Sequence, residues 1–63
     1  MILLRRATID DCVRGNLVWW DDDPFLFMET HDDSDDPIVV IAYASDPSDE
    51  EWVRLSELGV LAK

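Results

Sequence analysis

The central part of the chain carries negative charge with no positive charge to balance it. Between Gly15 and Val53 there are twelve carboxylates and no lysine or arginine. The acids lie on either side of short apolar runs, such as residues 25–28. This arrangement predicts a small apolar scaffold that presents negative charge on its surface.

The composition predicts one small folded domain, residues 1–63. Disordered acidic tails combine high charge with few hydrophobic residues, whereas 48% of this chain is hydrophobic. The formal net charge is −10 at pH 7. A protein with this charge repels nucleic acid and anionic membranes and is attracted to basic surfaces. We therefore expect no direct nucleic-acid binding and no membrane association.

Three features favour a cytoplasmic location. Cys12 is the single cysteine, so no internal disulfide can form. Arg5 and Arg6 follow a very short apolar run, which is the reverse of the order in a secretory signal. The longest apolar run, residues 38–44, is far too short to span a bilayer.

Four segments have the apolar and β-branched composition of strands: residues 2–4, 17–20, 25–28 and 38–44. The four residues 21–24 predict a hairpin connection between the second and third segments. A short helix is expected over residues 9–14. Thr8 and Asp11 have the spacing of a capping box, and Gly15 is suited to end a helix in the left-handed conformation.

The C-terminal part predicts a second helix. Asp46 and Pro47 are a favourable N-cap and first helical residue. Apolar residues then recur at helical spacing until Gly59, namely Trp52, Leu55 and Leu58. The sequence therefore predicts an α+β fold: a small antiparallel sheet of three to four strands, with a C-terminal helix on one face and a short N-terminal helix.

The predicted strands are apolar on both faces, although a strand buried on one face should alternate. Either the short N-terminal helix covers the second face, or some of Trp19, Leu26 and Met28 contact a partner. The second option leaves open a homodimer formed through exposed apolar strand residues.

Nothing in the chain predicts an enzyme or a cofactor site. His31 is the one histidine, and no third group is available to orient a couple between His31 and Cys12. The acidic loop supplies oxygen ligands that calcium prefers. An EF-hand loop that began at Asp32 would need glycine and glutamate where Pro37 and Tyr43 stand. We therefore predict no dedicated metal site.

The acidic clusters differ in how well local structure explains them. Carboxylates in the first turn of a helix are stabilised by its dipole, which accounts for Asp10 and Asp11 and for the acids of the C-terminal helix. The turn 21–24 needs fewer acids than it has, and the loop at 32–36 has no local requirement for four carboxylates. The predicted partner-binding residues are Asp21, Asp22, Asp23, Glu29, Asp32, Asp33, Asp35 and Asp36. A secondary set consists of Asp46, Asp49, Glu50 and Glu51.

Adaptation to high salt is an alternative explanation of the acidity. It predicts acids over the whole surface with arginines among them. In this chain the basic residues are confined to the two ends: Arg5, Arg6, Arg14, Arg54 and Lys63. This distribution favours a functional role for the acidic surface.

A rigid array of carboxylates resembles the phosphate backbone of DNA. Alternate residues of a strand lie about 6.6 Å apart, which is similar in order of magnitude to the spacing of phosphates along one DNA strand. In size, charge and lack of catalytic residues the chain resembles small phage-encoded inhibitors that mimic DNA, above all anti-CRISPR proteins against Cascade-type complexes. These proteins share no diagnostic motif, so no functional residue is carried over.

The resemblance implies a non-enzymatic inhibitor in the cytoplasm of an infected or lysogenic bacterium. Its partner would be the basic DNA-binding surface of a protein or ribonucleoprotein complex, with a type I complex as the expected target. Two alternatives remain at this point. The first is an acidic immunity or antitoxin protein that neutralises a basic nuclease toxin, and the second is a calcium-binding module.

Overall fold

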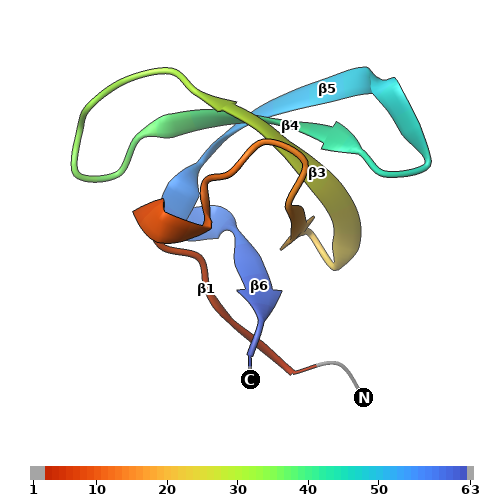
Figure 1. Ribbon diagram of the computed structural model, residues 1–63, viewed down its shortest axis with the longest axis horizontal. Coiled ribbons are helices and arrows are strands. Elements are labelled where there is room, and N and C mark those ends of the chain that lie inside the picture. Colours follow the sequence, from red (N-terminus) through yellow and green to blue (C-terminus); the bar gives the residue numbers. More distant parts are fainter. Residues whose placement is uncertain (1–2, 63) are drawn as a thin grey trace.

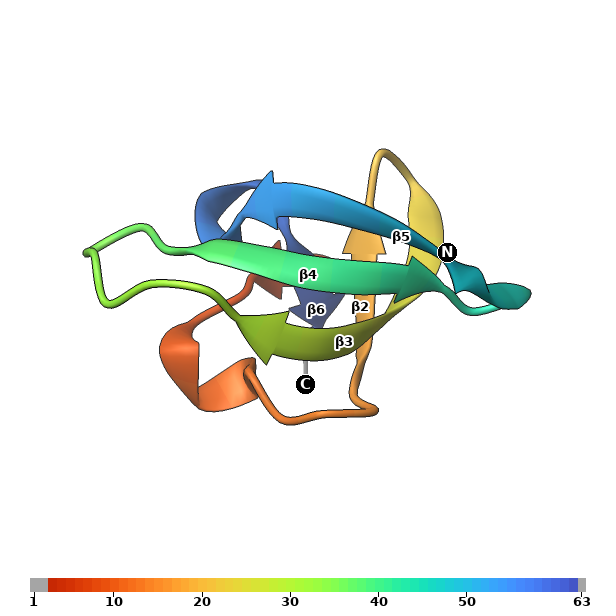
Figure 2. The ribbon, with the colours of Figure 1, turned by 90° about the horizontal axis from the view of Figure 1, so that it is seen from above.

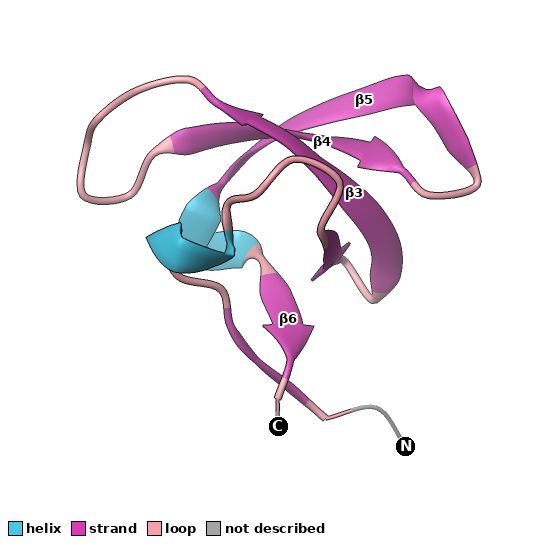
Figure 3. Ribbon diagram, viewed as in Figure 1, coloured by secondary structure: helices cyan, strands magenta, loops and turns pink. Residues whose placement is uncertain are grey.

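The apolar runs of the central chain form the middle of one antiparallel sheet. The computed structural model describes residues 3–62, and its six strands pair in the order β1-β6-β2-β3-β4-β5. The strands are β1 (Leu4–Arg6), β2 (Leu17–Trp20), β3 (Asp23–Thr30), β4 (Ile38–Tyr43), β5 (Asp46–Arg54) and β6 (Gly59–Leu61). The helical segments within residues 3–62 are two 3₁₀ turns, η1 (Ile9–Asp11) and η2 (Leu55–Glu57) (Figure 3). The fold is all-β, and the predicted α+β fold is wrong.

The sheet bends over on itself, so its two halves form two layers. β3, β4 and β5 make one layer, and β1 and β6 lie on the other side of the molecule (Figure 1). Seen from above, β2 crosses β3, β4 and β5 steeply (Figure 2). η2 interrupts the chain between β5, at the edge of the sheet, and β6, which pairs with both β1 and β2.

The core fills the space between the layers with alternate residues of the central strands. Phe25 and Phe27 of β3 and Val39 and Ile41 of β4 are at most 3% exposed. They belong to one cluster with residues from β2, β5, β6 and η2. Burial of such side chains stabilises the fold by roughly 1.5–3 kcal/mol each.

The predicted C-terminal helix is wrong, because residues 46–54 form β5. A two-residue turn at Ala44 and Ser45 leads directly from β4 into β5, and Tyr43 pairs with Asp46. Without this strand, one edge of the deeply buried β4 would have no partner for its N–H and C=O groups. That requirement outweighs the weak helix preference of the segment.

The C-terminal apolar residues with helical spacing do not lie on one face of a single element. Val53 of β5 faces the core, whereas Trp52 is 61% exposed. Leu55 lies in η2, and Leu58 follows it. Gly59, which was predicted to end the helix, lies in β6, where an added Cβ would stand 3.3 Å from Leu4 Cδ1. A side chain at this position would therefore require the Leu4 side chain of β1 to shift.

The predicted helix over residues 9–14 is also wrong, because η1 ends after three residues. The chain turns at Gly15, whose φ of 91° has the predicted left-handed sign. It then pairs with β3: the Gly15 N–H donates to the Phe27 carbonyl, and the Phe27 N–H donates to the Asn16 carbonyl, each at 2.8 Å. The predicted strand 2–4 is shifted to β1, Leu4–Arg6, and Ile2 lies outside the described residues.

Within residues 3–62, no strand or 3₁₀ turn lies over the outer face of the β3–β4–β5 layer (Figures 1 and 2). The segment around η1 places Ala7 and Cys12 against the core between the layers. On the outer face Val40 and Ala42 are nevertheless 2% and 0% exposed. They lie opposite Trp52 and Glu50 of β5. The predicted residues of an apolar contact, Trp19, Leu26 and Met28, are half-buried.

The β2–β3 connection is a two-residue turn and not the predicted four-residue one. Trp20 pairs with Asp23, which leaves Asp21 and Asp22 as the turn. Both have positive φ, 52° and 65°. Positive φ at both central residues is the signature of a type I′ turn, which matches the twist of the flanking strands. Aspartate tolerates this conformation better than most residues, but glycine adopts it without strain.

We therefore predict that Asp22→Gly stabilises the fold. The gain over Asp22→Asn should be about 0.5–1 kcal/mol in a urea titration, because both variants remove the charge and only glycine removes the backbone strain. Asp22→Val should destabilise the protein, since a β-branched residue is least tolerated at positive φ. Equal stability of the glycine and asparagine variants would contradict a type I′ turn.

Candidate functional site: an unpaired carboxylate surface

The two acidic clusters predicted as the partner-binding site lie at opposite ends of β3. Asp21, Asp22 and Asp23 form the β2–β3 turn and the start of the strand, and the loop 31–37 follows its end (Figure 1). Eight strand residues span about 25 Å. The hairpin therefore holds two groups of carboxylates at a fixed separation.

These carboxylates are exposed and lack cationic partners. All members of the predicted primary set are exposed except Asp36, which is half-buried. Within residues 3–62 the one ion pair is Arg5–Asp11, outside that set. The charges of Arg54 and Arg6 reach Asp36, and that of Arg54 reaches Asp32, but no member of the set forms an ion pair within residues 3–62.

The loop 31–37 needs two of its four carboxylates for its own structure, so the prediction that it has no such need is wrong. Asp32 accepts hydrogen bonds from the Ser34 N–H at 3.0 Å, the Ser34 hydroxyl at 2.6 Å and the Ile38 N–H at 3.2 Å. Asp36 accepts from the Ser56 N–H at 2.8 Å and its hydroxyl at 2.7 Å. These hydrogen bonds from Ser34 and Ser56 lower the pKa of the Asp32 and Asp36 carboxyls, respectively. Asp33 and Asp35 make no such contacts within the described chain.

The secondary set lies on a strand and not at a helix start. Asp46 accepts hydrogen bonds from the Ser48 hydroxyl at 2.7 Å and from its N–H at 3.4 Å. Asp49 and Glu50 are exposed on β5, and Glu51 is half-buried. Because there is no helix dipole here, the reason for ranking these acids below the primary set disappears.

Tyr43 shows that the two predicted sets meet at one end of the sheet. Burial is the main reason that the pKa of the Tyr43 hydroxyl is raised. The negative charges of Glu51, Asp49, Asp23 and Asp21 raise it further. The β2–β3 turn and β5 therefore form one acidic region around this ring. Sequence reasoning missed it because it placed residues 46–58 on a helix.

Glu29 lies on the outer face of the sheet, in line with an exposed aromatic pair. It is opposite Val40 of β4, which is in turn opposite Trp52 of β5. The His31 ring stacks on the Trp52 indole, with ring centroids 4.1 Å apart and planes at 30°. Neither residue was predicted to contribute to the site.

An open groove of about 620 Å³ lies beside the loop 31–37. Arg6 and Ile9 line it from the N-terminal segment, and Asp35 and Asp36 line it from the loop. Leu55 and Pro37 add apolar surface. The groove is a second feature that the sequence did not predict, since Arg6 is thirty residues from Asp36.

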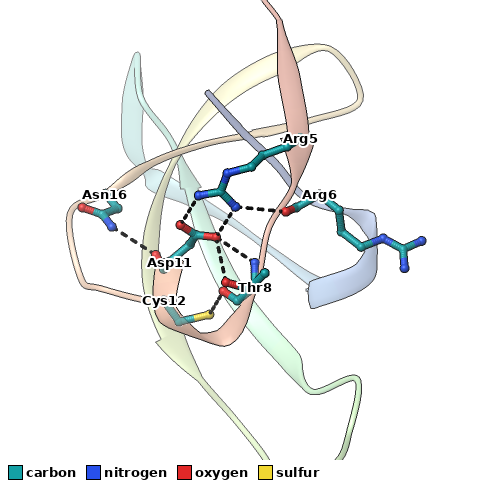
Figure 4. Close-up of polar contacts among 6 residues, drawn as sticks. All are labelled: Arg5, Arg6, Thr8, Asp11, Cys12 and Asn16. Atoms are coloured by element: carbon teal, nitrogen blue, oxygen red, sulfur yellow. Dashed lines mark hydrogen bonds and ion pairs between the residues drawn. The ribbon is translucent and has the colours of Figure 1, made fainter. Parts of the chain in front are cut away.

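Asp11 stabilises the N-terminal segment. Its carboxylate accepts two hydrogen bonds from the Arg5 guanidinium, each at 2.9 Å, and one from the Thr8 N–H at 2.8 Å (Figure 4). The hydrogen bonds from Arg5, followed by the one from Thr8, lower the pKa of Asp11 to about 2. Asp10, its neighbour, has no side-chain hydrogen bond within residues 3–62.

The described residues contain no group of three or more histidine, cysteine, aspartate or glutamate side chains placed to hold a metal ion. No helix in residues 3–62 is long and apolar enough to cross a membrane. No protein-family model matches the chain, and no significant match is found among curated proteins or solved structures. The site must therefore be interpreted from its own chemistry.

The lowered pKa of Asp11 predicts a loss of stability in acid. An unfolded aspartate has a pKa of about 3.9. The stabilisation by Asp11 is therefore complete above about pH 5 and is lost as the pH falls through its folded pKa, about 2. Asp11→Asn should lower Tm at pH 7, and its difference from the wild type should shrink towards pH 2. Asp10→Asn, with the same change in charge, should leave Tm close to that of the wild type at pH 7. A pH-independent difference for Asp11→Asn would contradict the assignment.

The hydrogen bonds of the loop 31–37 predict which of its acids are structural. Asp32→Ala and Asp36→Ala should lower Tm, because each leaves backbone N–H and hydroxyl donors without their acceptor. Asp33→Ala and Asp35→Ala should leave Tm unchanged or raise it, since they only relieve repulsion. Thermal unfolding of the four variants at one ionic strength provides the measurement. A similar Tm for all four would mean that the loop does not depend on these contacts.

Proposed function

We propose that the protein is a non-enzymatic inhibitor that mimics DNA. Its carboxylate surface occupies the basic DNA-binding channel of a bacterial defence complex and excludes the nucleic acid. Its target would be a type I CRISPR complex of the Cascade kind. The protein would then act in the cytoplasm of an infected or lysogenic bacterium.

The observation that carries this proposal is the set of exposed, unpaired carboxylates at fixed positions on a hairpin. Asp21–Asp23 and Asp33 with Asp35 are separated by about 25 Å of strand. A track of several phosphates on DNA has a similar length. Because the strand is held in a sheet, ordering these charges on binding costs little conformational entropy.

The arrangement of the basic residues supports this reading over simple adaptation to high salt. Arg5 is paired with Asp11. Arg54 donates to the Asp36 carbonyl at 3.1 Å. Neither arginine forms an ion pair with Asp21–Asp23 or with the acids of β5.

DNA mimicry predicts that the protein and duplex DNA compete for the same partner. The wild type should displace fluorescent duplex DNA from a purified, guide-loaded type I complex. Asp33→Asn with Asp35→Asn should weaken this competition about tenfold, because two exposed charge contacts of up to about 1 kcal/mol each are lost. Binding should also weaken steeply with added salt.

Asp10→Lys is the matched control, because it changes the net charge by the same two units outside the proposed surface. It should retain most of the competition. A loss equal to that of the double variant would mean that only total charge matters. Simultaneous binding of DNA and protein to the complex would exclude mimicry. Neutralisation of a basic nuclease toxin, with no effect on the defence complex, would instead establish the immunity-protein alternative.

A further inference from the structure

One edge of the sheet is open within the described chain. β5 is the last strand in the sheet order and pairs on one side only, with β4. An edge strand leaves the N–H and C=O groups of alternate residues without partners. Such an edge can add a strand from another chain, with backbone hydrogen bonds supplying affinity.

The hydrogen bonds at the end of β5 show which residues face the open side. The Leu55 N–H donates to the Pro37 carbonyl at 2.9 Å, towards β4. Backbone groups alternate along an antiparallel strand. The backbone N–H and C=O groups of Val53 and Glu51 therefore also point towards β4, whereas those of Glu50, Trp52 and Arg54 point to the open side.

The outward edge is limited to two residues. The Arg54 N–H donates to the Glu57 carboxylate at 2.9 Å, so Glu57 closes the edge at that end. At the other end the register shifts between Ala42 and Tyr43, which sets residues 47–49 outside regular pairing with β4. The backbone groups of Glu50 and Trp52 remain to accept a strand.

The side chains beside this edge determine which kind of added strand would bind there. Trp52 is 61% exposed, and His31 stacks on its ring. An exposed indole is a favourable contact for an arginine or lysine side chain through the cation–π interaction. Glu50, Glu51 and Asp49 add negative charge along the same edge. These features are complementary to an extended basic segment.

A second copy of this chain fits the edge poorly. Antiparallel self-pairing centred on Trp52 would place Glu50 opposite Arg54. That register needs the Arg54 N–H, which is already bonded to Glu57. The register that uses only the backbone groups of Glu50 and Trp52 is centred on Glu51 and places this carboxylate opposite its own copy. Like charges directly opposite each other are destabilising.

We propose that β5 binds an extended, arginine- or lysine-bearing segment of the partner by strand addition at Glu50 and Trp52. The assignment of this segment to a basic DNA-binding protein rests on the proposed function. The edge itself is a property of the fold and can be tested without the defence complex.

The test uses two synthetic peptides of alternating arginine and valine, one unmodified and one N-methylated at alternate backbone nitrogens. We expect the unmodified peptide to bind the full chain, and the methylated peptide to bind at least about tenfold more weakly, because it cannot complete the ladder. Equal affinity of the two peptides would overturn the proposal in favour of charge attraction alone.

Protein variants provide an independent arm. Glu50→Gln removes the charge and keeps the backbone N–H, whereas Glu50→Pro removes both. The Glu50 N–H does not bond to β4, so its loss leaves the pairing of β4 with β5 in place. We expect the proline variant to bind the unmodified peptide about tenfold more weakly than the glutamine variant. The far-UV circular dichroism spectrum of the proline variant should match that of the wild type. Equal affinities would overturn strand addition. A concentration-dependent dimer in sedimentation, lost in Glu50→Pro, would assign the edge to a second copy instead.

The two proposals fail in different experiments. If DNA competition holds and Glu50→Pro behaves as Glu50→Gln towards the peptide, strand addition fails alone. If the peptide result holds and DNA is not displaced from the complex, DNA mimicry fails alone.

Discussion

β4 is buried on both faces, and this constrains the rest of the structure. Val39 and Ile41 fill the core, and Val40 and Ala42 are equally inaccessible on the opposite side. A strand in this position must find a backbone partner along each edge, because unpaired polar groups away from water are costly. β3 supplies one partner and β5 the other. The pairing with β5 therefore carries Asp49, Glu50 and Glu51 to the edge of the sheet, although the local sequence favours a helix.

The sequence predicted the centre of the sheet and failed at its ends. The strand 17–20 matches β2, β3 contains the run 25–28, and β4 covers residues 38–43 of the run 38–44, because long apolar segments leave few alternatives. The C-terminal error came from a coincidence: Trp52, Leu55 and Leu58 have helical spacing but lie in a strand, a 3₁₀ turn and the residue after it. Only the need of β4 for a second neighbouring strand decides whether this segment forms a helix or a strand. That need depends on residues distant in sequence.

The candidate site was predicted in part. The location of Asp21–Asp23 and of the loop 31–37 at opposite ends of one strand followed from the hairpin pattern, and the structure has this arrangement. The structural role of Asp36 could not be predicted, because Ser56 lies twenty residues from it. Asp32 bonds Ser34, two residues further on, which is a local turn pattern that the sequence analysis overlooked. The acidic region around Tyr43 depends on β5 and was missed with it. Partners distant in sequence account for the errors at Asp36 and around Tyr43.

Tyr43 gives the acidic surface an intrinsic optical reporter. It is the single tyrosine of the chain, so no other phenol contributes to its ultraviolet ionisation spectrum. Four carboxylates from two separate segments act on its hydroxyl. A cation bound near them would offset their charge and make the phenol easier to ionise. The absorbance of one unmodified side chain can therefore follow how far the surrounding negative potential is neutralised in solution.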